Sequence, residues 1–282
     1  MLIRLINISL IFALIGTLLS ILLVGGGYLL LKPGFPEINL VDEEVLQIPL
    51  KVYSADGVLI GEFGEQKRRT IEYKDIPENL KNAFLAAEDD QFFQHNGIRV
   101  PSLVRAFYQM VKSGEIVSGG GTISMQVVRG YLLSREQKII RKIKEIYLAF
   151  ELESIATKEE ILSLYLNTIF LGNRSYGVEA AANQYFAKSI NELTLAESAL
   201  IASSAQLPSR INPIRSPDRS IVRRNWILGR MFKLGYIGKA QYLLARDEPI
   251  ALSQVKARFS LDGRYIACLL YTSPSPRDTP QS

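Results

Sequence analysis

Ionisable side chains are concentrated in the segment AAEDDQFFQHNGI, residues Ala86–Ile98. Three consecutive carboxylates, two phenylalanines and His95, the only histidine of the chain, lie within it. Glu88 and Asp89 follow an apolar run with helical spacing, and the Asn-Gly pair after His95 is a helix stop signal. A carboxylate held at such a helix end beside aromatic rings is partly desolvated, which raises its pKa toward the range useful in general acid–base catalysis. The alternative is a solvated helix end, because runs of charge usually face water.

Other catalytic systems are restricted by the composition. A single cysteine, Cys268, excludes a disulfide framework and a cysteine zinc site, and a single histidine excludes a multi-histidine metal site. Catalysis is therefore expected to depend on carboxylates. The chain is 48% hydrophobic, so it can bury a core, and its net charge of +5 favours anionic partners. Nucleic acid is not expected as a partner, because no RNP, zinc-knuckle or P-loop pattern occurs.

A glycine-rich stretch, SGGGTISMQVVRG, covers residues Ser118–Gly130. Its glycines would let the backbone approach a ligand closely, and their amides could cradle an anion. A flexible loop that leads into a helix is an equally good interpretation.

A basic helical stretch, REQKIIRKIKEIYLAFELE, covers residues Arg135–Glu153. At helical spacing one side carries apolar residues, namely Ile139, Ile143, Ile146 and Phe150. The opposite side carries charged residues, namely Lys138, Arg141, Lys142 and Glu145. A cationic stripe with one carboxylate suits a diphosphate leaving group. A solvated face with pairs such as Arg141–Glu145 is the alternative.

The elements that must position these side chains are predicted to be mainly helical. Capping-box spacings, which mark helix starts, recur at Asp75, Ser134, Thr157 and Thr194, and Pro77 falls in a first turn. They predict a mainly α domain of eight to ten helices over residues 75–247. Residues 100–116 form an amphipathic stretch with an apolar stripe of Leu103, Val104, Phe107 and Val111, and with Arg105 and Lys112 alongside.

The flanking segments differ in character. Residues 5–31 are nearly all apolar and long enough to span a bilayer, so residues 1–32 are predicted to be a cytoplasmic tip and a transmembrane anchor. A cleaved signal peptide is the alternative. Residues 33–74 alternate apolar and polar side chains around Asp56-Gly57, which predicts a β-hairpin. Residues 248–282 are interpreted as a truncated linker with a non-native, Pro/Ser-rich tail.

Taken together and in their order along the chain, the acidic, glycine-rich and basic stretches and the segments that follow them resemble the five sequence blocks of the peptidoglycan glycosyltransferases, glycosyltransferase family 51. The chain is most similar to the N-terminal half of class A penicillin-binding proteins of the 1a type, over residues 3–267. The first block, E-D-x-x-F-x-x-H-x-G, is met by Glu88, Asp89, Phe92, His95 and Gly97. The third, R-K-x-x-E, is met by Arg141, Lys142 and Glu145, and the fourth, I-L-x-x-Y-L-N, by residues that include Tyr165 and Asn167.

Two blocks depart from the family pattern. The second, G-G-S-T-I-T-Q-Q, reads GGGTISMQ here, so Gly120, Thr122 and Gln126 are retained while Gly121, Ser124 and Met125 differ. The fifth keeps Pro208 and Pro213 but has Ser203-Ser204 where Gly-Leu is expected. A further S-x-x-K match at Ser253–Lys256 is attributed to chance, since neither S-D-N nor K-T-G follows, and no transpeptidase domain is expected within this chain.

The resemblance implies a mostly α, lysozyme-like domain with a small membrane-associated jaw. It implies polymerisation of lipid II into β-1,4-linked glycan strands with release of undecaprenyl diphosphate. Glu88 would be the general base and Glu145 the second catalytic glutamate. The implied substrate-binding residues are Asp89, Phe92, His95, Gly120, Thr122, Gln126, Arg129, Arg141, Lys142, Tyr165 and Asn167.

The surroundings implied by the resemblance are those of a bacterial inner membrane. The chain would cross it once, with a cytoplasmic N-terminus and a periplasmic catalytic domain, and would meet lipid II, the growing glycan strand, membrane lipid and other cell-wall synthesis proteins. No cofactor is assigned from the residues, and a divalent cation, Mg²⁺ or Mn²⁺, is the candidate. Two alternatives stay open: a lytic enzyme that cleaves glycan on a similar fold, and a non-catalytic cell-wall scaffold.

Overall fold

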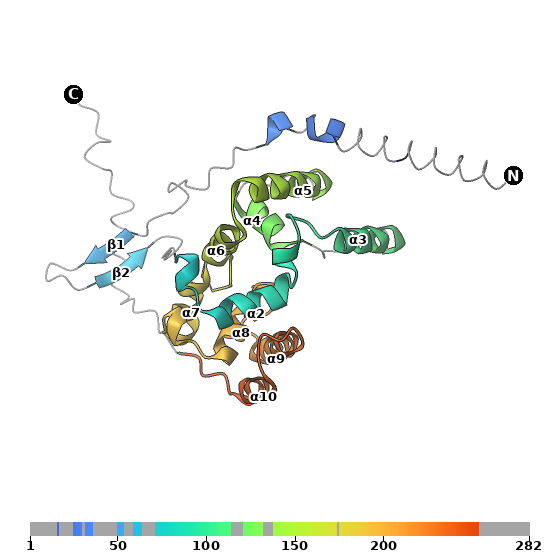
Figure 1. Ribbon diagram of the computed structural model, residues 1–282. Helices are drawn as coiled ribbons and strands as arrows, with labels where there is room; N and C mark the ends of the chain where they lie inside the picture. Colours follow the sequence, from blue (N-terminus) through green and yellow to red (C-terminus); the bar gives the residue numbers. More distant parts are fainter. Residues whose placement is uncertain are drawn as a thin grey trace, which may run out of the picture.

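The computed structural model describes residues 16, 25–29, 32–35, 50–53, 59–63, 71–113, 121–131, 138–173 and 175–253. This part is mainly helical (Figure 1). Its longer helices are α2 (Glu78–Glu88), α3 (Val100–Ser113), α4 (Ile123–Tyr131), α5 (Lys138–Ile155), α6 (Lys158–Thr168), α7 (Val178–Phe186), α8 (Leu195–Ser203), α9 (Pro217–Lys233) and α10 (Lys239–Asp247). The mainly α fold class predicted from the sequence is confirmed.

Two predicted helix starts are confirmed in atomic detail. Thr157 and Thr194 are the N-caps of α6 and α8, and each forms a complete capping box with the glutamate three residues later. The start predicted at Asp75 is wrong in detail: Asp75 ends a short 3₁₀ helix (Tyr73–Asp75), and α2 begins after Pro77 without a side-chain cap. The capping box predicted at residues 134–137 lies outside the described residues.

The core of the domain is organised around α8, which is buried along almost its whole length. A helix that is buried along almost its whole length must be covered on several sides, and α2, α9 and α7 lie against α8. A second group is formed by α4, which packs against α5 and α6. In Figure 1, α2 lies between α4 and α9, so its C-terminal end faces both groups.

The exposed side of α5 is not the one that the apolar periodicity indicated. The predicted apolar side is partly exposed, with 40% of Ile143 and 44% of Phe150 accessible to solvent. The buried side is formed by Glu145, Leu148, Ala149 and Leu152. The inward face of α5 therefore contains Glu145, which the helical spacing had placed on the charged side, opposite the apolar residues. Its burial is tolerated because two cations of the same helix pair with it.

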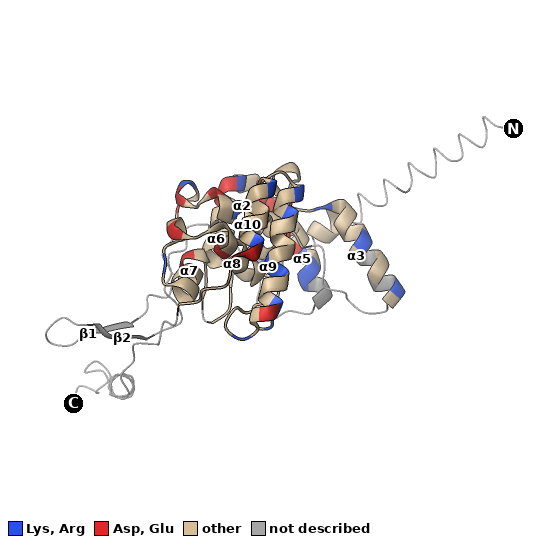
Figure 2. Ribbon diagram, turned by 90° about the horizontal axis from the view of Figure 1, so that it is seen from below, with Lys and Arg blue, Asp and Glu red and all other residues tan. Residues whose placement is uncertain are grey.

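Helix α3 stands away from the other helices in two perpendicular views (Figures 1 and 2). It leaves Val100, Val104 and Tyr108 more than half exposed, and Arg105 and Lys112 are exposed as well. Of the predicted apolar stripe, Leu103 is half-buried, and the side chains of Phe107 and Val111 lie outside the description. Apolar and basic side chains are therefore exposed together on α3.

The N-terminal region is described only in pieces. Strands β1 (Leu50–Tyr53) and β2 (Leu59–Phe63) pair antiparallel, with Leu50 opposite Phe63, while the turn predicted at Asp56-Gly57 lies outside the described residues. The predicted membrane anchor also lies mostly outside them. Among the residues that the structure does describe, no helix has the length and apolar character needed to cross a bilayer. Tyr28, just before the end of this predicted anchor, packs on Tyr147 of α5 with ring centroids 5.5 Å apart.

Candidate active site

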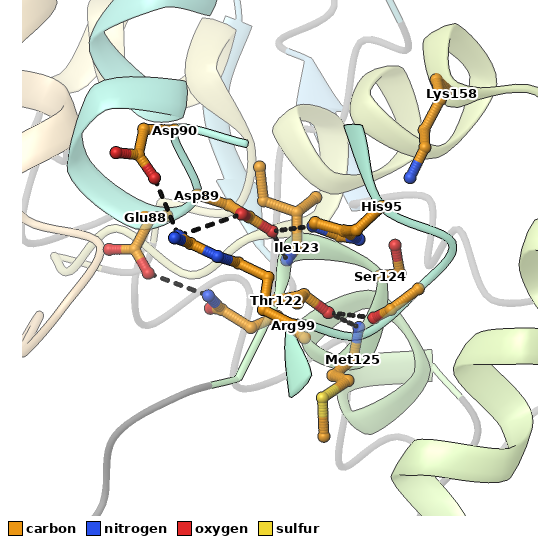
Figure 3. Close-up of polar contacts among 12 residues, drawn as sticks. Glu88, Asp89, Asp90, His95, Arg99, Thr122, Ile123, Ser124, Met125 and Lys158 are labelled. Atoms are coloured by element: carbon orange, nitrogen blue, oxygen red, sulfur yellow. Dashed lines mark hydrogen bonds and ion pairs between the residues drawn. The ribbon is translucent and has the colours of Figure 1, made fainter. Parts of the chain in front are cut away.

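Glu88 is the last residue of α2, and the helix ends there because the backbone of Asp89 is not helical, with φ −156° and ψ 82°. The carboxylate of Glu88 is half-buried and accepts a hydrogen bond of 2.8 Å from Nε2 of Gln126 on α4. Burial raises the pKa of Glu88, whereas the Gln126 hydrogen bond and the charges of Arg223 and Arg129 oppose that rise. Figure 3 shows Glu88 turned away from the neighbouring carboxylates. A carboxyl group with a raised pKa beside cations can exchange a proton with a ligand.

Asp89 has a different environment from Glu88, since its side chain is only 1% exposed. Its Oδ2 accepts a hydrogen bond from Nε2 of His95 at 2.9 Å and one from the backbone N–H of Ile123 at 3.3 Å (Figure 3). Ile123 is the first residue of α4, so the carboxylate lies at the positive end of that helix. Asp89 therefore fixes α4, which carries Gln126, against the end of α2.

Asp90 was not among the predicted site residues, yet it joins two distant elements. One of its oxygens lies 2.7 Å from Nη1 of Arg99, which immediately precedes α3, and the other lies 2.6 Å from Nη2 of Arg230 on α9. Arg230 is 140 residues away along the chain. The three consecutive acidic residues could be recognised from the sequence, but no local spacing indicates this pair of partners.

The second block supplies the backbone around the site rather than a row of exposed polar side chains. Thr122 is buried and donates to the carbonyl of Gly97, and Ser124 is fully buried and donates to Glu153. Met125 is also buried, with 1% of its surface exposed. At two of the departures from the family pattern, Ser124 and Met125, the side chains therefore face the interior. Gly120 lies outside the described residues.

The basic pair on α5 is organised by a buried carboxylate. Glu145 is 3% exposed, and its two oxygens lie 3.7 Å from Nε of Arg141 and 3.0 Å from Nζ of Lys142. The spacing predicted from the sequence therefore brings these three residues together. A Cβ atom at Gly121 would lie 3.7 Å from Nζ of Lys142, which places this cation beside the glycine that precedes α4.

A cavity of about 350 Å³ lies beside Gln126. It is lined by side chains from α4, α6 and the loops after α6 and α8, among them Gln126, Arg129, Tyr165, Phe170, Tyr176 and Gln206. Arg129 is exposed and is a cation at this cavity, whereas Tyr165 is 2% exposed and its hydroxyl has no hydrogen-bond partner among the described atoms. Burial raises the pKa of Tyr165 far above its usual value, and the charge of Glu88 adds to this effect.

Phe170 and Tyr176 were missed by the sequence analysis. Their rings lie 4.7 Å apart, and their backbones form an isolated antiparallel bridge in the turn before α7. The glycines at 172 and 177 close this turn with positive φ angles. Glycines are a general signal of turns, but no sequence pattern indicated that two aromatic rings on this turn border the cavity.

Three predicted substrate-binding residues have contacts within the fold. Phe92 is 1% exposed, and Nζ of Lys158 lies 4.4 Å from its ring centroid. His95 is held by Asp89. Asn167 accepts a hydrogen bond of 2.9 Å from the N–H of Ile71 and donates one of 2.8 Å to its carbonyl. These contacts place the three side chains in the framework that supports the site.

A dedicated metal site is not formed by the described residues. Among them, no three histidine, cysteine, aspartate or glutamate side chains lie close enough together to hold a metal ion. Glu145, the carboxylate nearest to the basic pair, is already engaged by two cations.

Comparison with known proteins gives a consistent result. The chain is 51% identical over 252 residues to Penicillin-binding protein 1A of Pseudomonas aeruginosa, which covers 89% of this chain and 30% of that protein. It is 40% identical over 242 residues to Penicillin-binding protein 1A of Escherichia coli, and the match covers 86% of this chain and 28% of that protein. The crystal structure of Penicillin-Binding Protein 1A from Haemophilus influenzae superposes with a TM-score of 0.51 at 36% identity, over 83% of this chain and 26% of that one.

The chain thus spans about 30% of the length of the curated relatives it matches. The match to a family model extends over residues 56–232, which contain Glu88, the basic pair on α5 and the cavity, and that model is described as Transglycosylase. The resemblance found in the sequence blocks is confirmed, and the chain belongs to the transglycosylase family.

Proposed function

We propose that this chain is a peptidoglycan glycosyltransferase that polymerises lipid II into β-1,4-linked glycan strands and releases undecaprenyl diphosphate. The observation that carries the proposal is the half-buried carboxylate of Glu88, hydrogen-bonded to a glutamine that lines a cavity with a cation, Arg129. Membership of the transglycosylase family supports it, as does the similarity to proteins named Penicillin-binding protein 1A.

In the proposed reaction Glu88 is the general base. Its ionised carboxylate takes the proton from a sugar hydroxyl of the acceptor, and that oxygen forms a bond to the anomeric carbon of the growing strand. The bond between this carbon and the diphosphate oxygen breaks with inversion, and its electron pair leaves with the lipid diphosphate. The hydrogen bond of 2.8 Å from Nε2 of Gln126 to the carboxylate of Glu88 orients this base for such a proton transfer.

The leaving diphosphate gathers negative charge, which cations can stabilise. Arg129 at the cavity and the pair of Arg141 and Lys142 supply this charge in the proposed site. Glu145 is the residue that holds the basic pair in place, because it is buried and contacts both. Asp89, which anchors the first turn of α4, holds that helix in register with Glu88.

The cavity also has surfaces that suit sugar rings. Phe170 and Tyr176 border it with half-buried aromatic rings, and sugars pack their apolar faces against such rings. Gln206, on the loop after α8, adds amide groups for sugar hydroxyls. These residues are proposed contacts for the glycan part of the substrate.

A membrane surface is the proposed setting of the reaction, since the substrate carries a long lipid. The exposed apolar residues Val104 on α3 and Phe150 on α5 would lie at the lipid boundary, with Lys112 near the head groups. Tyr28 and Tyr147 would lie at the same level, because tyrosines favour this interface. A single-pass inner-membrane location with a periplasmic domain, and contact with other cell-wall synthesis proteins, belong to the same proposal.

A divalent cation is proposed only as a companion of the substrate diphosphate, because the described carboxylates do not form a site for it. The test is lipid II polymerisation before and after removal of metal with a chelator, followed by addition of Mg²⁺ or Mn²⁺. No step of the proposed reaction depends on the ion.

Two substrates separate the proposed function from glycan cleavage. The detergent-solubilised full chain should polymerise lipid II and leave finished sacculi intact, and E88Q should reduce polymerisation by at least about 100-fold, as expected for the loss of a general base. E159Q, which changes an exposed glutamate at the start of α6, is the matched control and should stay near the wild-type rate. Release of soluble sugar from sacculi would favour a lytic enzyme. Lipid II binding without turnover in both wild type and E88Q would favour a scaffold.

A further inference from the structure

Helix α9 presents a row of alternating cationic and aromatic side chains. The guanidinium carbon of Arg223 lies 4.0 Å from the ring centroid of Trp226, and that of Arg230 lies 5.4 Å from the same ring. The three residues are spaced at i, i+3 and i+7, so they share one face of the helix. Trp226 is the only tryptophan of the chain, and 45% of it is exposed.

This face lies against the end of α2 that carries Glu88. Nε of Arg230 donates to the carbonyl of Ala86 at 3.0 Å, and its Nη2 lies 2.6 Å from Oδ2 of Asp90. Ala86 and Asp90 are the second residues before and after Glu88. Because seven residues make about two helical turns, Arg223 extends the same face roughly 10 Å along α9 from this attachment.

Arg223 is half-buried, and its Nε atom is buried without a hydrogen-bond partner among the described atoms. Burial lowers the pKa of Arg223, whereas the negative charge of Glu88 opposes that change. The effect is mutual: burial raises the pKa of Glu88, and the charge of Arg223 counteracts it. A half-buried arginine that forms no ion pair within 4 Å among the described residues is a costly arrangement unless its charge is used.

The other groups that face Glu88 come from different elements. Gln126 and Arg129 approach from α4, Tyr165 belongs to α6, and Asp89 is its neighbour in sequence. Arg129 is exposed at the cavity, where a diphosphate would neutralise it in the proposed reaction. Arg223 belongs to α9, which contributes no residue to the lining of this cavity, so it is a cation from a different element than Arg129.

We propose that Arg223, held in place by stacking on Trp226, is a positioning residue that keeps Glu88 ionised and ready to accept the proton of the acceptor hydroxyl. This inference rests on the proposed function and adds a second cation to it, on the side of Glu88 formed by α9. Trp226 has a supporting role in this proposal, because stacking on its ring restricts the conformations of the Arg223 side chain.

The test is the pH dependence of lipid II polymerisation by the full chain carrying R223Q. An ionised base is required, so the rate rises with pH through the apparent pKa of Glu88. Removing a nearby cation raises that pKa. The acid limb of the pH–rate profile, which is the part where the rate rises with pH, should therefore move to higher pH by at least about 0.5 pH unit. At alkaline pH the rate should return to near the wild-type value, which a merely structural defect would not allow.

Two further variants keep the test decisive. R223K retains the charge and should keep the acid limb near its wild-type position, while W226L should move it in the same direction as R223Q by a smaller amount. R219Q, at an exposed arginine in the first turns of α9, is the matched control and should leave the profile unchanged. If R223Q does not fold, W226L carries the test.

An unchanged acid limb in R223Q, or an equal loss of rate at every pH, would overturn the role of Arg223. The proposed function fails separately, if E88Q retains polymerisation. The two failures are therefore distinguishable in one set of assays.

Discussion

Replacing Asp89 with alanine should destabilise the fold far more than replacing an exposed aspartate that is also ion-paired. The carboxylate of Asp89 accepts hydrogen bonds from His95 and from the N–H of Ile123, and Nη1 of Arg99 lies 3.8 Å away. A hydrogen bond to a charged group contributes about 1.5–3 kcal/mol, so the loss of two should cost about 3–6 kcal/mol. This agrees with the usual cost of removing one partner from a buried pair.

The matched control is D247A. Asp247 also pairs with an arginine, at 3.0 Å from Nε of Arg246, but its side chain is 70% exposed. Exposed pairs contribute little, so D247A should stay within about 0.5 kcal/mol of wild type. Both variants and D89N would be unfolded with urea in detergent, with helical circular dichroism and the fluorescence of Trp226 as probes. D89N should fall between the others, because an amide oxygen can still accept hydrogen bonds but carries no negative charge.

The result that would refute this reasoning is a D89A variant within about 1 kcal/mol of wild type, or equal costs for D89A and D247A. Either outcome would mean that the carboxylate of Asp89 does not hold the start of α4 in solution. A large loss of stability in D89A with unchanged polymerisation at low temperature would instead separate the support of α4 from catalysis.

The remaining predictions concern Glu88, two glycines and a buried arginine. Because its pKa is raised, Glu88 favours its protonated form in the folded state, and the fold therefore loses stability as pH rises from the unfolded-state pKa through the folded-state pKa. E88Q should increase the free energy of unfolding at pH 7 by about 0.5–2 kcal/mol. This gain should vanish below pH ~4, as measured by thermal unfolding. G177A should cost more than about 2 kcal/mol, because the new Cβ would lie 2.5 Å from a backbone carbonyl oxygen and φ is +83°, whereas G130A, with open space around it, should be neutral or stabilising in the same measurement. R224M should cost about 2–4 kcal/mol in urea unfolding, since the guanidinium of Arg224 donates to two backbone carbonyls near the end of α10; a value near zero would show that water replaces it.

Local signals in the sequence predicted the helical framework well. The threonine and glutamate pairs at the starts of α6 and α8 predicted their caps correctly, because a capping box uses only residues within one turn. The end of the helix near Glu88 was also predicted correctly, since its stop signal lies only a few residues further along the chain.

The face of α5 was predicted less well for a physical reason. Periodicity sorts residues by hydrophobicity, and it therefore placed Glu145 opposite the apolar side. In the fold Glu145 is buried because Arg141 and Lys142 pair with it, and Ile143 is left partly exposed. Burial of a paired charge depends on contacts that hydrophobic spacing does not weigh. Exposure of the apolar side is explained if that side meets lipid, which belongs to the proposed membrane setting.

The three consecutive carboxylates show most clearly what the sequence could and could not indicate. Glu88 ends α2 between two groups of helices, and its two acidic neighbours each bind a residue of one group. Asp89 binds the first residue of α4, and Asp90 binds Arg230 of α9. Both groups contribute a residue that acts on Glu88, namely Gln126 from α4 and Arg223 from α9. A base between two separately attached bodies keeps its geometry only if both attachments hold. The acidic run therefore combines the proposed chemistry with the two contacts that position it, and because those contacts reach 34 and 140 residues along the chain, only the folded structure assigns them.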